Sequence, residues 1–257
     1  MQFASLGSGS KGNATLVRAD DTLVMVDCGF SLRETTRRLD RLGVEPGELD
    51  AILVTHEHSD HSSGVAALSR KYRVPVYLTH GTASTGRCAG SHQLCCFDSE
   101  ADFTIGCLDV KAVTVPHDAV EPCQYLLTRG EHCFGILTDL GSVTPHVLAN
   151  YRDCHSLLLE FNHDLGMLQA GVYPPHLKRR VGGDWGHLNN EQAADLLRQL
   201  GGAPEGHLVV AHISENNNSR QKAEQALLSV LESLDRVVWA EQAGGFDWLA
   251  IGQDEVH

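Results

Sequence analysis

Short apolar runs recur along the chain and predict buried β-strands. The predicted strands span residues 22–27, 51–55, 74–79, 108–115, 124–128, 134–138, 156–160, 207–211 and 237–240. Several of these runs end next to a histidine or an aspartate. Because α/β proteins place their chemistry at the carboxyl ends of strands, we expect a functional site there.

Fewer segments show the apolar spacing of a helix. They span residues 33–42, 62–72, 191–200 and 219–234, and Asn189 or Asn190 is expected to cap the third. Many strands with few helices favour an α/β fold in which two sheets lie between helices, rather than a strictly alternating doubly wound sheet. Single cores stop growing near about 250–300 residues. We therefore expect one domain spanning residues 1–257.

The predicted strand 51–55 runs directly into the sequence His-Glu-His-Ser-Asp-His at 56–61. Imidazole and carboxylate ligands suit zinc, iron or manganese, and the lack of nearby cysteine disfavours a closed structural zinc site. His56 and His58 alternate on an extended segment and can face one ion, whereas Asp60 and His61 lie beyond the turn and can face a second. Two ions about 3.5–4 Å apart can stabilise a displacement at phosphorus.

This string resembles the first metal motif of the metallo-β-lactamase superfamily, whose fold is an αββα sandwich of two mixed sheets flanked by helices. The resemblance covers nearly the whole chain for the YycJ/WalJ-like branch, whose members are regarded as metal-dependent exonucleases. The segments that carry it are 6–13, 117–119, 138–141, 160–164, 186–190 and 211–217. The chain is also similar to tRNA 3′-processing endonucleases and to the cyclic phosphodiesterase of phosphonate metabolism. It lacks the appended domain and the tRNA-gripping arm of larger processing nucleases, so broad RNA processing is not expected.

The resemblance implies a complete ligand set for two divalent ions. By position, His117, Asp139 and His212 match the family's later ligands, and each follows a predicted strand. The residues implied for the first ion are His56, His58 and His117. Those implied for the second are Asp60, His61 and His212, with Asp139 between the two ions. Asp60 or Asp139 would also orient the attacking water.

Four more residues are candidate contacts for the substrate. In the processing nucleases a histidine shortly before the last ligand can act as general acid, and His187 matches it; alternatively, His187 begins a helix and bonds its own backbone. His163 and Asp164 either face the substrate or hold the free ring nitrogen of a ligand. Asn216, in the last matching segment, is expected to contact the substrate.

The net charge of −13 argues against binding nucleic acid through a broad basic surface. A local site remains compatible with this charge, because two dications would add about four positive charges where a phosphate must lie. Arg33, Arg37 and Arg41 on one helical face and the cationic run 178–180 are candidate strand contacts, or equally solvated residues paired with acids. Eight cysteines without a C-x-x-C pair, and no signal peptide or membrane-spanning run, favour a cytoplasmic protein.

Three functions fit these features. The leading one is a dinuclear metal-dependent phosphodiester hydrolase, a DNA or RNA exonuclease whose nucleic-acid substrate is a single strand or an end. The second is a small-molecule hydrolase, either a cyclic phosphodiesterase or a glyoxalase II-type thioesterase, which the acidic surface favours. The third is a metal-binding protein without turnover. Zinc is the ion expected in the purified protein, and manganese also suits this ligand set for activity.

Overall fold

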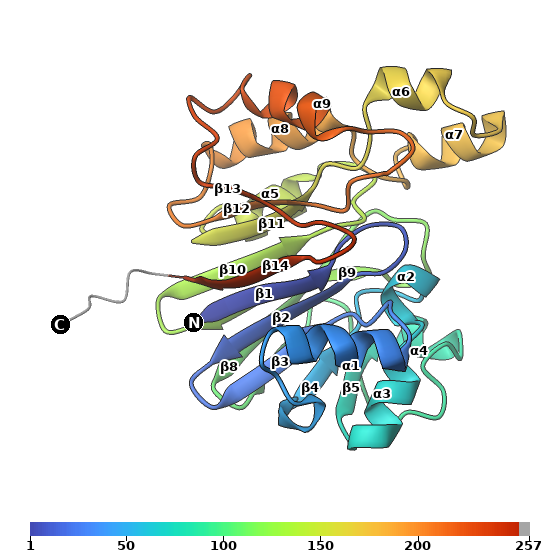
Figure 1. Ribbon diagram of the computed structural model, residues 1–257, viewed down its shortest axis with the longest axis vertical. Coiled ribbons are helices and arrows are strands. Elements are labelled where there is room, and N and C mark those ends of the chain that lie inside the picture. The colour runs from blue at the N-terminus through green and yellow to red at the C-terminus, as the bar shows by residue number, and fades with distance from the viewer. Residues whose placement is uncertain (252–257) are drawn as a thin grey trace.

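The computed structural model describes residues 1–251, whose strands form two seven-stranded mixed sheets with helices on their outer faces (Figure 1). The strand order is β14-β1-β2-β3-β4-β5-β6 in the first sheet and β13-β12-β11-β10-β9-β8-β7 in the second. From β1 to β14 the strands span Gln2–Gly7, Ala14–Ala19, Thr22–Val26, Ala51–Leu53, Pro75–Thr79, Gln93–Phe97, Asp102–Ile105, Leu108–Thr114, Cys123–Arg129, His132–Leu137, Ser156–Glu160, Leu208–Ala211, Val237–Trp239 and Phe246–Ala250.

Helices cover the outer face of each sheet. From α1 to α9 they span Leu32–Arg41, Ser59–Ser62, Val65–Tyr72, His80–Ser84, Pro145–Tyr151, Leu165–Ala170, Pro175–Val181, Asn190–Leu200 and Arg220–Leu227, and a short 3₁₀ helix, η1, spans Pro46–Glu48. Leu39 of α1 and Leu68 of α3 pack with the first sheet, whereas Leu197 of α8 and Leu227 of α9 pack with the second. The predicted αββα sandwich is confirmed.

One apolar layer joins the two sheets. Phe3 of β1 and Phe134 of β10 stack across it with ring centroids 4.1 Å apart, and both side chains are buried. Leu53 of β4 and Tyr125 of β9 belong to the same cluster. The prediction of one domain over residues 1–257 stays a prediction, and its last six residues lie outside the described part of the chain.

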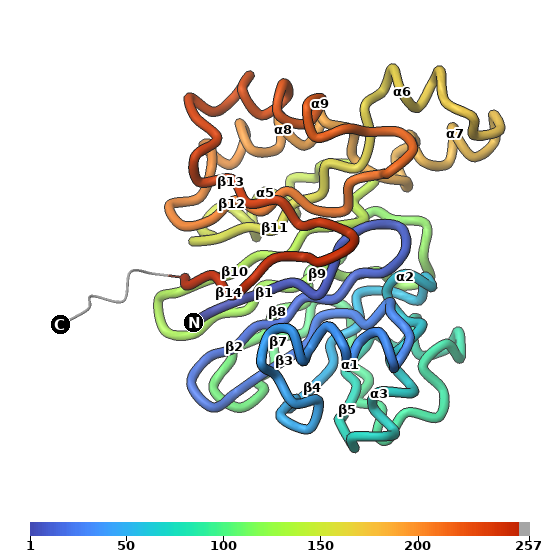
Figure 2. The backbone as a smooth tube through the Cα atoms, in the orientation of Figure 1, coloured from blue at the N-terminus to red at the C-terminus, as the bar shows by residue number. Residues whose placement is uncertain are grey.

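The sheet topology places the strand ends that matter on one edge of the sandwich. In the first sheet β3, β4, β5 and β6 run parallel, and in the second β10, β11, β12 and β13 do. Loops that follow these parallel strands therefore meet at the edge marked by α2 in Figure 1. Figure 2 shows the first and last strands, β1 and β14, side by side in the middle of the fold, where they pair antiparallel.

Most predicted strands and helices are confirmed within a few residues, and Asn189 caps α8 as expected. The helix predicted over 219–234 is wrong beyond Leu227, because the hydroxyl of Ser229 bonds the carbonyl of Ala226 and competes with the helix backbone. The sequence patterns did not predict β1, β2, β6, β7 and β14, nor helices α2 and α4 to α7. Within residues 1–251, no helix has the length and apolar character needed to cross a bilayer.

Candidate metal centre

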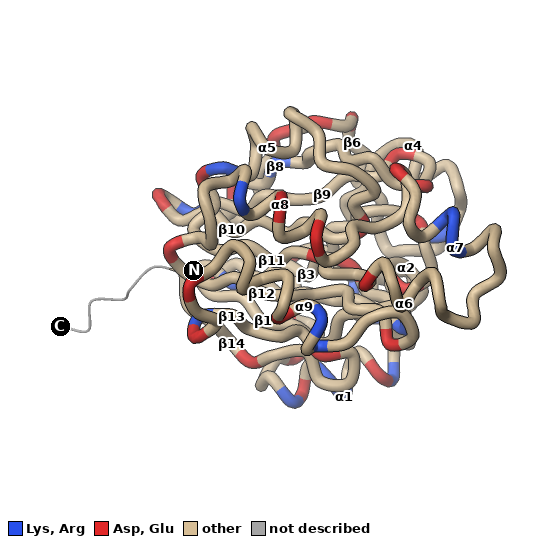
Figure 3. Tube along the Cα trace, turned by 90° about the horizontal axis from the view of Figure 1, so that it is seen from above, with Lys and Arg blue, Asp and Glu red and all other residues tan. Residues whose placement is uncertain are grey.

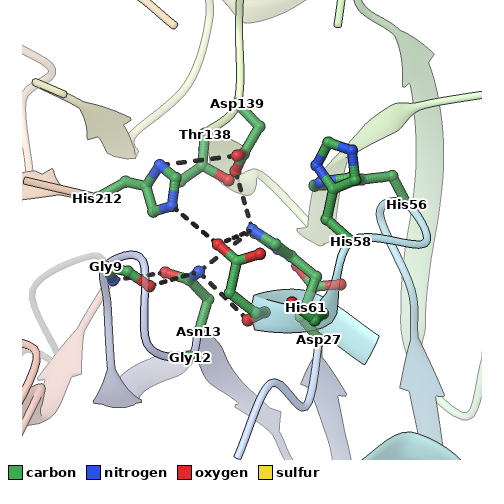
Figure 4. Close-up of polar contacts among 12 residues, drawn as sticks. Gly9, Gly12, Asn13, Asp27, His56, His58, His61, Thr138, Asp139 and His212 are labelled. Atoms are coloured by element: carbon green, nitrogen blue, oxygen red, sulfur yellow. Dashed lines mark hydrogen bonds and ion pairs between the residues drawn. The ribbon is translucent and has the colours of Figure 1, made fainter. Parts of the chain in front are cut away.

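Strand ends from both sheets bring the predicted ligands to one place (Figure 4). His56 and His58 lie in the loop after β4, and Asp60 and His61 lie in α2, which begins immediately after His58. The other three follow strands β8, β10 and β12 and are His117, Asp139 and His212. Asp139 and His212 both adopt φ of 51°, a left-handed conformation that a non-glycine residue rarely takes. Such backbone strain is typical of functional sites.

The ligand atoms fall into adjoining groups, within each of which all atoms lie no more than 4.8 Å apart. One group is His56, His58 and His117, and another is Asp60, His61 and His212. These are the two sets expected from the sequence. Asp139 lies between them, with Oδ2 3.2 Å from Nε2 of His61 and Oδ1 3.8 Å from Nε2 of His117. His187 also groups with Asp139 and His212.

The ring nitrogens that face away from the centre are held by the protein. Nδ1 of His61 lies 2.8 Å from Oδ2 of Asp27, and Nδ1 of His56 lies 3.0 Å from the hydroxyl of Thr55. Nδ1 of His117 lies 3.0 Å from the carbonyl oxygen of Gly186. Such contacts fix the orientation of an imidazole and leave its other nitrogen free for a cation.

Several buried polar atoms at the centre lack a well-formed hydrogen bond to the described residues and are of the type that binds a cation. Nε2 of His56, Nε2 of His212 and Oδ2 of Asp139 are buried and make no hydrogen bond of good geometry among the described residues. The latter two only face other side chains of the centre, Asp60 at 3.5 Å and His61 at 3.2 Å. A buried polar atom without a partner costs free energy comparable to a lost hydrogen bond. Because all three belong to the grouped side chains, the residues present fit bound metal, which would satisfy them.

The protonation states of the histidines at the centre also favour a bound cation. Burial, with a smaller effect of His61, lowers the pKa of His56 well below its ordinary value, so this imidazole is neutral and can offer a lone pair. Burial alone would lower the pKa of His212, but Asp139, Asp60 and Glu160 raise it to about 10. The carboxylates therefore stabilise positive charge at the position of His212. A divalent ion benefits from the same field.

Glu160 and Asp27 belong to this centre, although the sequence prediction gave neither a role. Glu160, buried at the end of β11, accepts hydrogen bonds from the amides of Leu140 and Leu188, at 2.6 and 3.2 Å. Its Oε2 lies 3.1 Å from Nδ1 of His187. The available signal was a charged residue that ends an otherwise apolar run, since such a residue is rarely buried without a partner.

The glycine-rich segment 6–13 supports two ligand-bearing loops. The side-chain oxygen of Asn13 accepts hydrogen bonds from the hydroxyl of Ser8 and the backbone amide of Gly9 (Figure 4). The backbone amide of Asn13 donates to the carbonyl of Asp60 at 2.8 Å. The hydroxyl of Ser8 accepts from the amide of His212 at 2.9 Å. This loop therefore fixes the backbone on both sides of the second ligand group.

A cleft of about 430 Å³ opens onto the centre. Its walls include His58, Asp60, Asp139, His187 and His212. Three further lining residues come from other elements. Arg87 follows α4, Tyr173 lies in the loop before α7, and Arg180 lies in α7.

The cleft contains only one of the four predicted substrate contacts, His187. The others are absent from its walls among the described residues. His163 is fully buried, with Nε2 unpaired in the described chain. Asp164 caps α6 by accepting from the amide of Met167 at 2.8 Å. Asn216 is exposed and donates to the hydroxyl of Tyr173 at 3.4 Å. These placements give Asp164 a structural role and leave its substrate contact a prediction.

The two predicted cationic groups differ in position. On α1, Arg37 pairs with Glu34 and Arg41 with Asp247, as the alternative interpretation holds, whereas Arg33 makes no ion pair with the described residues. The run 178–180 forms the last turn of α7, where Figure 3 shows a blue, basic segment on the same side of the molecule as α2. From this run Arg180 reaches the cleft and bonds Asp118.

Comparisons with known proteins agree with this geometry. Residues 22–213 match the family described as beta-lactamase superfamily domain. The exodeoxyribonuclease WalJ of Streptococcus pneumoniae is 34% identical over 91% of this chain and 89% of that protein. The exodeoxyribonuclease YycJ of Bacillus anthracis is 33% identical over 90% of this chain and 89% of that protein.

A solved structure shares the fold at low identity. The metallo-β-lactamase fold protein YhfI of Bacillus subtilis aligns with a TM-score of 0.75 and 17% identity, covering 97% of this chain and 99% of that one. Together with the clustered imidazoles and carboxylates, the match makes this a divalent-metal protein. The chain belongs to the beta-lactamase superfamily and, within it, to the family of the WalJ and YycJ proteins.

Proposed function

We propose that the chain is a dinuclear metal-dependent phosphodiester hydrolase that acts as an exonuclease on DNA or RNA. The observation that carries this proposal is the pair of adjoining ligand groups that meet at Asp139 on the wall of an open cleft. The names of relatives at 33–34% identity support the nuclease assignment. A cytoplasmic location is part of the proposal and is supported by eight cysteines that are all free thiols.

The proposed ligands follow the observed groups. The first ion takes His56, His58 and His117. The second takes Asp60, His61 and His212, and Asp139 serves both. Zinc is the ion we expect in the isolated protein, with manganese able to support activity, because imidazole and carboxylate suit both.

The protein side chains then have distinct tasks. Divalent ions, when bound, supply the Lewis-acid charge that makes water a nucleophile near neutral pH and offsets charge on phosphoryl oxygens. Asp60 and Asp139 orient that water. His187 is the proposed general acid: its Nδ1 is held 3.1 Å from Oε2 of Glu160, and the residue lines the cleft. A histidine held in this way can present a proton to a leaving oxygen in the cleft.

A small-molecule hydrolase is the second candidate, and one observation favours it. The cleft of about 430 Å³ is within the size range of small-ligand pockets, about 300–1,000 Å³. A cyclic phosphodiester or a glyoxalase II-type thioester would fill such a space without needing an extended surface. A single nucleotide unit would also fit, with the rest of the strand outside.

The test is a time course on 5′- and 3′-labelled strands with added manganese, combined with metal analysis. Wild-type protein should contain two ions per chain and shorten single strands stepwise from one end. Asp139→Ala should lose metal and about 100-fold or more in kcat/KM, because the ions supply several kcal/mol of charge stabilisation. Asp195→Ala, on the exposed face of α8 and paired with Arg198, is the matched control and should behave as wild type.

Two outcomes would overturn the exonuclease proposal. Intact strands after prolonged incubation, together with turnover of bis(p-nitrophenyl) phosphate or S-lactoylglutathione, would assign the chain to the second candidate. Bound metal with no turnover of any of these substrates would leave a binding protein.

A further inference from the structure

Trp185 is unusually exposed for its residue type. Its exposed fraction is 64%, and every other tryptophan, tyrosine and phenylalanine within residues 1–251 is buried or half-buried. Aromatic side chains normally bury most of their surface, since each removes a large apolar area from water. An exposed indole beside a functional site therefore suggests a ligand that covers it.

Trp185 directly precedes a segment that lines the cleft. Gly186 and His187, the next two residues, line the cleft, and the carbonyl of Trp185 accepts a hydrogen bond of 2.9 Å from the amide of Asp118, another cleft residue. On the other side the backbone packs against Gly141, where an added Cβ would lie 2.6 Å from Cα of Trp185. The backbone of Trp185 is thus held on two sides while its side chain faces solvent.

Cations lie around the same opening. Arg180 is oriented by Asp118, whose own backbone bonds Trp185. Arg87 is exposed, lines the cleft, and pairs with no carboxylate among the described residues. In a chain of net charge −13, an unpaired arginine at this position favours an anionic ligand. A ligand with both flat aromatic faces and phosphates satisfies the indole and the arginines together.

We propose that Trp185 is a stacking platform for a base of a single-stranded nucleic acid whose scissile phosphodiester lies in the metal cleft. The proposal rests on the nuclease function proposed above and adds how the strand is held. The cleft has room for a small ligand, so neighbouring nucleotides lie outside it, and Trp185 directly precedes two residues of its wall, Gly186 and His187. Stacking on an aromatic ring is tolerant of base identity, which suits a nuclease that removes nucleotides in succession. Arg87 is the accompanying contact for the backbone phosphate.

The first test separates binding of the strand from the chemical step. Trp185→Ala should raise KM for an oligothymidine strand about 5- to 150-fold, the range that stacking of one base provides, with little change in kcat. Trp185→Phe should restore most of the affinity. Turnover of an abasic strand built from tetrahydrofuran and phosphate units, which has a similar backbone and no aromatic ring to stack, should be unchanged in both variants. Leu228→Ala, which removes another exposed apolar side chain outside the cleft walls, is the matched control and should match wild type.

A spectroscopic measurement reports on the contact itself. Adding a hydrolysis-resistant phosphorothioate oligothymidine should quench the tryptophan fluorescence of the wild type and leave that of Trp185→Phe unchanged. The other tryptophans, Trp239 and Trp248, lie beside Arg220 and Arg18 and are only partly exposed.

The outcomes distinguish this inference from the function on which it rests. If wild-type protein degrades no strand, the nuclease function fails. If it degrades strands, yet Trp185→Ala keeps the wild-type KM or the quenching persists in Trp185→Phe, the stacking platform is wrong. A wild-type dimer in light scattering that Trp185→Ala converts to a monomer would assign the indole to contact with a second copy instead, which also overturns the proposal.

Discussion

Glu160 shows how much a single side chain contributes to this centre. Its two carboxylate oxygens contact the amides of Leu140 and Leu188 and the rings of His187 and His212. The amides belong to the loop after Asp139 and the loop after His187, so one residue positions parts of three segments. Its pKa is lowered to about 2: burial alone would raise it, and His187 and His212 more than offset this. Glu160 is therefore an anion that orients neighbouring imidazoles.

Replacing Glu160 with glutamine should weaken metal binding without removing a ligand. The amide keeps the shape, but its NH₂ group would face a backbone or ring donor, and the loss of charge leaves His212 less well oriented. Loss of such a supporting partner typically costs about 10- to 100-fold in metal affinity. The measurement is zinc affinity by competition with a chelator. Glu100→Gln alters a carboxylate that also accepts from an amide and a histidine, Thr114 and His146, and should leave zinc affinity unchanged.

An unchanged affinity in Glu160→Gln would show that the imidazoles are oriented without this carboxylate.

At the scale of elements, α1 is tied to the rest of the fold through Arg38, which pairs with Glu34 of the same helix. Glu34 contacts Arg38 at 2.6 Å, and Arg38 is largely buried where it donates to the carbonyls of Leu6 and Gln242. Hydrogen bonds from Arg37 and then Arg38 lower the pKa of Glu34 to about 2. Because its folded-state pKa lies below the unfolded value, Glu34 stabilises the fold above pH 4.5, and this contribution is lost as the pH falls toward 2.

Glu34→Gln should lower the free energy of unfolding by about 1 kcal/mol at pH 7, since the pair is partly exposed and solvent screens it. The difference between wild type and variant should shrink below pH 4.5, where the wild-type carboxylate becomes protonated on unfolding. Urea unfolding at several pH values between 7 and 3 measures both effects. A difference that stays constant over this range would mean that the charge of Glu34 does not carry the stabilisation.

Some site residues and elements could be predicted from the sequence, and others could not. His56 to His61 form a contiguous motif that the local pattern shows, whereas His117, Asp139 and His212 were expected from the resemblance to the family, each at the end of an apolar run. Glu160 was harder, because its partners are amides of loops that only the fold brings near. Strand β1 carries Ser5 in its buried stretch, and the hydroxyl is satisfied by Ala14 across the sheet, a pairing that no local pattern shows.

On the scale of the whole molecule, the centre links the two sheets. His56, His58, Asp60 and His61 follow β4 of the first sheet, whereas Asp139 and His212 follow β10 and β12 of the second. Ions held by the proposed ligands would therefore connect the two sheets at this edge, and elsewhere the sheets are joined by the apolar layer that includes Phe3 and Phe134. The unfolded chain has no such preformed site, so metal affinity adds directly to folding stability.

Removal of metal should consequently lower the melting temperature. A ligand at 1,000 times its Kd stabilises the folded state by about 4 kcal/mol, which corresponds to about 10 °C for a protein of this size. Calorimetry or circular dichroism before and after dialysis against a chelator, followed by readdition of zinc or manganese, measures the shift and its reversal. Asp139→Ala should show a much smaller dependence on metal, because this residue lies between the two ligand groups and is the proposed ligand of both ions, while Asp195→Ala should respond as wild type does. If the melting temperature of the wild type were independent of chelator although metal analysis showed loss of the ions, the ions would not be coupling the two sheets, and the centre would be fully organised by the protein alone.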